Sequence, residues 1–296
     1  MENISVTAQN RRALQITFAL TSIYFIVELI GGILTNSLAL LADAAHMLTD
    51  VGGLALALFA TWIAKKPATP QKTYGYYRVE ILAALANAVV LFLISFYILY
   101  EAYRRFEEPP EVASLPMLLI AVIGLAINLV GIWNLHHGAK ESLNVHGAYL
   151  EVVSDALGSM GVIVAAVIML VSGWYYADPI FSVFIGLFIL PRTWKLLTQA
   201  ANVLLEATPA HINVATVEEA MLKVDGVEAV HDLHIWTITS GMEALSAHVV
   251  LADGSESQTS SRVLETITAK LKEEFGIDHT TIQVEHLSRR EKETQH

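Results

Sequence analysis

The sequence predicts an α-helical membrane protein with six transmembrane helices and a C-terminal soluble α+β domain. Of its 296 residues, 54% are hydrophobic and only 16% are charged, whereas an ordinary soluble domain is about 25% charged. Six stretches are long enough to cross a bilayer, which takes about 20 mostly apolar residues. We therefore expect a transmembrane domain over residues 1–205 and a soluble domain over residues 206–296.

Charge and cysteine content narrow the function classes. The formal net charge is −11 at pH 7, of which residues 206–296 carry −9 and residues 1–205 only −2. This acidic balance argues against a nucleic-acid partner, because phosphate binding needs Lys and Arg. The chain has no cysteine, which excludes disulfides, thiolate zinc sites and thiol catalysis. Any transition-metal site must therefore use His, Asp and Glu.

The predicted spans are separated by short polar breaks. They cover residues 13–34, 38–64, 79–103, 114–137, 145–173 and 177–201. The first is longer than the apolar core of a signal peptide, which favours a membrane span over a cleaved leader. Asp178-Pro179 predicts an N-cap and first turn for the sixth span. Lys and Arg are concentrated in the loops on the side of the N-terminus, so we expect both termini in the cytoplasm.

The soluble domain shows a different periodicity. Helical spacing of apolar residues covers 213–224, and alternating segments at 231–239 and 243–252 read as strands joined by a Ser240-Gly241 turn. Ser255 or Ser257 is a candidate cap for a helix ending at Phe275. A last strand is expected at 280–286. The predicted order is α-β-β-α-β.

Ionisable residues inside two spans form the candidate site. Asp43, His46 and Asp50 fall within an arc of about 60° on the second span. Glu151 and Asp155 are spaced i, i+4 on the fifth. Ionisable groups in a span are costly and usually face the bundle interior, where they mark a pathway. Four ligands from two facing helices, His46, Asp50, Glu151 and Asp155, suit tetrahedral coordination of Zn²⁺ or a similar dication.

Other polar residues in the spans have simpler interpretations. Glu28, Asn87 and Asn128 are expected to make interhelical hydrogen bonds. That interpretation does not extend to the two i, i+4 pairs, because we expect no span lysine or arginine to be available to their carboxylates. Asp43 has three alternatives: a residue supporting the ligands, a proton carrier, or a side chain near the water interface.

Five motifs resemble those of the cation diffusion facilitator family. They are Ser37–Asp50 (SLALLADAAHMLTD), Tyr74–Glu80 (YGYYRVE), Ser154–Ser159 (SDALGS), His231–Trp236 (HDLHIW) and Ser246–His248 (SAH). The motifs occur in matching spans and order, and the resemblance covers nearly the whole chain.

The resemblance implies a homodimeric, proton-coupled exporter of divalent metal from the cytoplasm, with a metallochaperone-like soluble domain. Its transport site matches His46, Asp50, Glu151 and Asp155. The family commonly has His at the position of Glu151. A carboxylate there makes the site harder and extends the expected range beyond Zn²⁺ to Cd²⁺, Co²⁺, Mn²⁺ or Fe²⁺.

The resemblance also assigns residues around and within the soluble domain. A second metal site, with a regulatory role, matches His231, His248 and Glu285, with His286 adjacent. His231 and Glu285 are expected to meet on adjacent strands. Arg78 and Glu206 match a charge interlock between the membrane and soluble domains.

These observations favour an exporter of divalent metal, Zn²⁺ first, that works by alternating access in the bilayer of the cell (inner) membrane. Metal and protons compete for the same carboxylates, which couples their movements. No phosphate-binding loop motif is present, in agreement with transport without ATP. A channel or sensor that does not pump is one alternative. An enzyme, such as a membrane metallohydrolase, is less favoured because the sequence has no His-Glu-x-x-His signature.

Overall fold

A computed structural model describes the backbone of residues 2–64, 66–136, 138–140, 143–252 and 257–286. Side chains are described in these ranges except at 2–12, 49–50, 54, 57, 61, 64, 140, 143–144, 257–259 and 286. The chain forms two compact units. The first combines Met1–Leu58 with Ala86–Leu197, and the second combines Phe59–Leu85 with Thr198–His296.

Six helices in the described part of the chain are long and apolar enough to cross a membrane, as the sequence predicts. They are α1 (Glu2–Thr35), α2 (Leu38–Ala64), α3 (Val79–Glu107), α4 (Ser114–Leu135), α5 (Leu143–Ser172) and α6 (Ala177–Leu204). Large apolar side chains cover their outward surface, among them Leu34, Leu93, Trp133 and Val171. An apolar surface of this extent fits a lipid environment, so the chain is an integral membrane protein.

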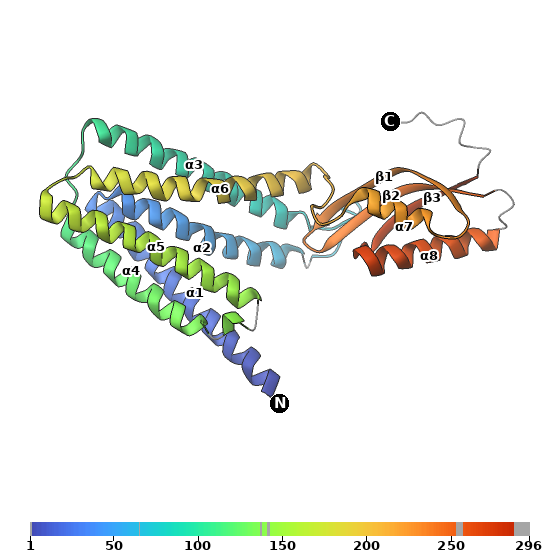
Figure 1. The fold of residues 1–296 in the computed structure, drawn as a ribbon, viewed down its shortest axis with the longest axis horizontal. Helices are drawn as coiled ribbons and strands as arrows, with labels where there is room; N and C mark the ends of the chain where they lie inside the picture. The colour runs from blue at the N-terminus through green and yellow to red at the C-terminus, as the bar shows by residue number, and fades with distance from the viewer. Residues whose placement is uncertain (1, 65, 137, 141–142, 253–256, 287–296) are drawn as a thin grey trace. The chain divides into compact units, whose positions relative to one another are not determined.

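Helix α2 lies at the centre of the first unit. Its residues Ala39 and Leu40 belong to a buried cluster with α4 and α5, while Leu38 and Ala42 pack with α3 and α6. Figure 1 shows α1, α4 and α5 side by side within this unit. Asp43 and His46 of α2 are buried and consequently face other helices rather than lipid.

Asp178 does not cap its own helix, and the predicted N-cap of the sixth span is wrong. Helix α6 already begins one residue earlier, and the Asp178 carboxylate accepts hydrogen bonds from Ser37 Oγ (2.7 Å), Leu38 N (2.9 Å) and Ala39 N (3.1 Å). The first N–H groups of a helix need acceptors, and here they are buried. Arg105 Nη1 also donates to Asp178, at 3.2 Å. Asp178 therefore caps α2 from a neighbouring helix.

The soluble part of the second unit has the predicted α-β-β-α-β order. Its elements are α7 (Val214–Leu222), β1 (Val227–Thr239), β2 (Met242–Leu251), α8 (Ser257–Phe275) and β3 (His279–His286). Strand β2 is central, antiparallel to β1 and parallel to β3. The core is contributed by both the sheet and the helices, including Leu245, Val249 and Ile267. The predicted cap at Ser255 or Ser257 lies outside the described side chains.

Candidate metal sites

The membrane site centres on one histidine and one carboxylate. His46 Nε2 of α2 lies 3.7 Å from Asp155 Oδ1 of α5, and the two residues are 4% and 2% exposed. Among the described residues, neither His46 nitrogen and neither Asp155 oxygen has a hydrogen-bond partner. Buried polar atoms without partners are costly. A dication placed between these side chains, or protons on them, would relieve that cost.

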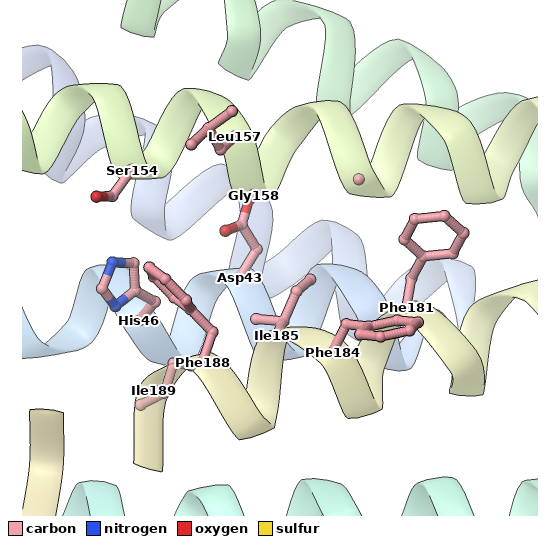
Figure 2. A pocket seen from close by; sticks show the side chains of 11 residues that line it. Asp43, His46, Ser154, Leu157, Gly158, Phe181, Phe184, Ile185, Phe188 and Ile189 are labelled. Atoms are coloured by element: carbon pink, nitrogen blue, oxygen red, sulfur yellow. The ribbon is translucent and has the colours of Figure 1, made fainter. Parts of the chain in front are cut away.

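A partly open cavity of about 330 Å³ lies beside His46 between α2, α5 and α6. Figure 2 shows Asp43 and His46 projecting from α2 toward Ser154 and Gly158 of α5, while phenylalanines of α6 line the other wall. A Cβ at Gly158 would overlap Asp43 Oδ1, so glycine is needed for this close approach. The cavity thus has a polar wall that presents His46 and an apolar wall from α6.

Asp43 belongs to a buried polar network behind His46. It is 2% exposed, which argues against a position at the water interface, and Ser159 Oγ donates to it at 3.4 Å. Glu28 on α1 interacts electrostatically with Asp43; it is fully buried and accepts a hydrogen bond from Tyr24 at 3.0 Å. Asn128 of α4 donates to Ser159 of α5 at 3.5 Å, an interhelical contact of the kind expected from the sequence.

Glu151 of α5 is paired with an arginine. Arg192 of α6 donates from Nη1 and Nη2 to Glu151 Oε1 and Oε2, the second bond being 3.0 Å long. The expectation that no span lysine or arginine is available to these carboxylates is therefore wrong. An arginine inside an apolar span was itself a signal, because such a residue needs a partner. The Asp50 side chain lies outside the described residues.

The second site is a compact cluster in the soluble domain. His231 Nε2 lies 3.1 Å from Glu285 Oε2, and His248 Nδ1 lies 2.9 Å from Glu285 Oε1. One ligand atom from each residue lies within 4.8 Å of the others. His231 and His248 are directly opposite on β1 and β2. The expectation of adjacent strands for His231 and Glu285 is wrong, because β2 lies between β1 and β3; their side chains meet nonetheless.

The carboxyl groups of Glu285 and its neighbour Asp232 have lowered pKa values. Burial raises the pKa of Glu285, but hydrogen bonds with Gln283 and His231 and the nearby histidine charges outweigh it, so the net pKa is lowered. A hydrogen bond with His234 lowers the pKa of Asp232. Both carboxyl groups are therefore ionised near neutral pH. The His286 side chain lies outside the described residues.

Asp232 is a neighbour of the cluster that the sequence did not single out. Its Oδ2 lies 3.8 Å from His248 Nε2, and its Oδ1 lies 2.9 Å from His234 Nε2. Asp232 has a positive φ of 52° at an irregularity in the β1–β2 pairing. This backbone conformation is uncommon outside glycine, although Asp adopts it more readily than most residues. No pattern in the sequence alone predicts this backbone conformation of Asp232.

Two further contacts join segments of the second unit. Arg78 Nη2 donates to Glu206 Oε1 at 2.8 Å, bringing together the residues of the expected interlock. Glu80, in the first turn of α3, accepts hydrogen bonds from Thr239 (2.7 Å) and Ser240 (2.9 Å). Sequence analysis placed Glu80 in a motif but gave it no role. Its partners could not be found from the sequence, since they lie about 160 residues away along the chain.

The fold and these two sites define a polytopic membrane protein with candidate metal-ligating groups in its helices and in its soluble domain. Residues 14–205 match the cation efflux transmembrane domain, and residues 209–287 match the cytoplasmic domain of cation efflux proteins. The chain belongs to the cation diffusion facilitator family, as its motifs indicated.

Similar proteins cover almost the whole chain. The metal cation efflux system protein CzcD of Cupriavidus metallidurans is 50% identical over 93% of this chain and 87% of its own. The cadmium, cobalt and zinc/H(+)-K(+) antiporter of Bacillus subtilis is 45% identical, covering 93% and 89%. The zinc transporter ZitB of Escherichia coli is 39% identical, covering 94% and 88%. A solved metal-bound C-terminal domain of CzcD is 40% identical over 25% of this chain and 99% of its own, with a TM-score of 0.23.

Proposed function

We propose that this chain exports divalent transition-metal cations from the cytoplasm, Zn²⁺ first, in exchange for protons by alternating access. The metal is the substrate, and its ligands are His46, Asp50, Glu151 and Asp155. Relatives named as zinc transporter and as cadmium, cobalt and zinc antiporter support this range of metals. A carboxylate at Glu151 in place of a histidine favours the broader range.

The observation that carries the proposal is the His46–Asp155 pair. Its ligand atoms come from two different helices, are buried, and lack hydrogen-bond partners among the described residues. Ligands on separate helices can be exposed first to one side and then to the other when the helices move, which is the basis of alternating access. The cavity beside His46 supplies space for an ion to approach.

Proton coupling follows from the chemistry of the ligands. Metal binding needs deprotonated carboxylates and a neutral imidazole. When the metal leaves, buried carboxylates that repel one another take up protons. Protons entering from the far side would therefore promote metal release there, and loss of those protons to the cytoplasm would regenerate the empty site.

The soluble domain is proposed to sense metal. A dication at His231, His248 and Glu285, with His286 adjacent, would be held by residues of three strands and so stabilise the sheet. The domain is proposed to span residues 206–296 and to dimerise, consistent with the name of the matching family domain. The Arg78–Glu206 pair would act as an interlock between this domain and the transmembrane domain. Both termini are placed in the cytoplasm, and the protein in the cell (inner) membrane.

Metal uptake by proteoliposomes tests the proposal. The full chain is reconstituted, and Zn²⁺, Cd²⁺ and Co²⁺ are supplied outside one at a time, with the lumen either acidic or at the external pH. We expect several-fold faster uptake with an acidic lumen and loss of that gain when a protonophore collapses the gradient. Equal uptake in both conditions would show that protons do not drive transport.

A further inference from the structure

Arg192 is a cationic side chain within a membrane-spanning helix. Its two terminal nitrogens each donate to one carboxylate oxygen of Glu151, which forms a bidentate pair between α6 and α5. Such charge-assisted pairs are directional and stronger than neutral hydrogen bonds. Arg192 directly follows Pro191, which lies inside α6. Proline removes one helical hydrogen bond and so lowers the cost of moving this turn.

The guanidinium also acts on the rest of the membrane site. Its positive charge interacts electrostatically with both His46 and Asp155. The ligand atoms of the described residues His46, Glu151 and Asp155 do not all lie within 4.8 Å of one another, in contrast to those of the soluble cluster. Glu151 is instead directed to Arg192. A dication that used Glu151 as a ligand would have to take the place of the guanidinium.

We propose that Arg192 competes with the metal for Glu151: it pairs with the Glu151 carboxylate when the site is empty and is displaced when a dication binds. This inference rests on the proposed transport site. With His46 neutral, the three carboxylates of that site have a formal charge of −3, which Arg192 reduces to −2. The return of Arg192 to Glu151 stabilises the empty site, and breaking the pair lowers metal affinity. Weaker binding of this kind favours release, which every transport cycle requires.

A purely structural role makes the opposite prediction. If Arg192 only held α6 against α5, its removal would loosen the two helices and weaken metal binding or leave it unchanged. If Arg192 competes with the metal, its removal tightens binding, and this tightening depends on Glu151. The direction of the change in affinity and its dependence on Glu151 therefore separate the two roles.

Equilibrium binding of Zn²⁺ and Cd²⁺ to the full chain in detergent, measured against a competing chelator, tests the inference. Every protein carries His231→Ala and His248→Ala, which removes the soluble cluster. We expect Arg192→Gln to lower the Kd about 10-fold, the equivalent of about 1.4 kcal/mol. In a Glu151→Gln background, the same substitution should change the Kd less than about threefold, as a double-mutant cycle requires for coupled residues.

Arg104→Gln is the matched control, since it removes the same charge from a side chain that is 63% exposed and pairs with Glu101. We expect it to leave the Kd unchanged. Size-exclusion profiles establish that each variant is folded. An unchanged or weaker affinity in folded Arg192→Gln overturns the inference, and so does equal tightening with and without Glu151. Absence of metal binding to the parent protein would instead contradict the proposed transport site, and the two failures are thus distinguishable.

Discussion

The two candidate metal sites use the same ligand types in contrasting settings. In the membrane, His46 and Asp155 are at most 4% exposed, and the ligand atoms of this pair lack hydrogen-bond partners among the described residues. In the soluble domain, Glu285 is hydrogen-bonded to His231 and lies 2.9 Å from His248 Nδ1, and the side chains of these histidines are 29% and 22% exposed. A metal ion entering this cluster replaces contacts between groups that are already close together. In the proposed membrane site, a metal ion must also recruit Glu151 from Arg192. The soluble cluster is thus preformed, whereas the proposed membrane site has to be assembled.

The largest expected effect comes from a substitution that disrupts only the membrane site. Asp155→Asn keeps the shape of the side chain but removes its charge, and should reduce proteoliposome Zn²⁺ uptake roughly 100-fold or more, since loss of a ligand exceeds the cost of losing a supporting residue. Metal binding at the soluble cluster should be unchanged. Asp278→Asn, which removes a carboxylate paired with Lys272 at the surface, is the control and should transport normally. Normal uptake by Asp155→Asn would remove this residue from the site.

The sequence predicted the features of both regions that depend only on residues close together along the chain. Long apolar stretches define spans, and alternation defines strands, because both depend on neighbours along the chain. Helical spacing likewise placed Asp43, His46 and Asp50 on one face of α2, since that face depends only on the number of residues between them. The order of elements in the soluble domain followed from the same kind of signal.

What the sequence did not predict depends on how separate elements pack. Arg192 is 41 residues from Glu151, and the two meet only because α5 and α6 are neighbours. Asp178 caps α2 from 140 residues away, although its own sequence context, before a proline, is typical of a cap for the following helix. Both errors have one cause: local patterns identify a polar group but not the distant partner that satisfies it.

The next largest effect comes from a substitution that disrupts only the soluble cluster. In the full chain carrying Asp155→Asn, His248→Ala should weaken the remaining Zn²⁺ binding by about 10- to 100-fold, because a direct ligand is lost. Isothermal titration calorimetry measures it. His211→Ala is the matched control, since this histidine is 65% exposed and pairs with Glu243 outside the cluster. If His248→Ala binds Zn²⁺ as tightly as its parent, the cluster is not the second site.

A smaller effect comes from pH. The pKa of Glu285 is lowered, so its carboxylate stays ionised from pH 7 to pH 6 and adds nothing to the pH dependence. Histidine ligands must lose their protons to bind metal, so protons compete with Zn²⁺ and the affinity of the cluster should fall when the pH is lowered from 7 to 6. The same calorimetry at both pH values, in the Asp155→Asn chain, measures this change. Removing His248 should reduce the dependence of affinity on pH, because one ligand that competes for protons is lost. A pH-independent affinity would exclude histidine ligation.

The smallest expected effect tests whether metal binding by the soluble cluster depends on the hydrogen bonds between the β1–β2 turn and α3. Glu80→Gln weakens the hydrogen bonds from Thr239 and Ser240, at a cost of about 1 kcal/mol, and should speed amide hydrogen exchange in the turn about fivefold. Zn²⁺ affinity of the cluster should stay within about twofold, because Glu80 lies outside its network of hydrogen bonds. Exchange mass spectrometry measures the first quantity, with exposed Glu228→Gln as the control. If the affinity fell together with the protection, the cluster would depend on this attachment and would not be preformed within the sheet alone.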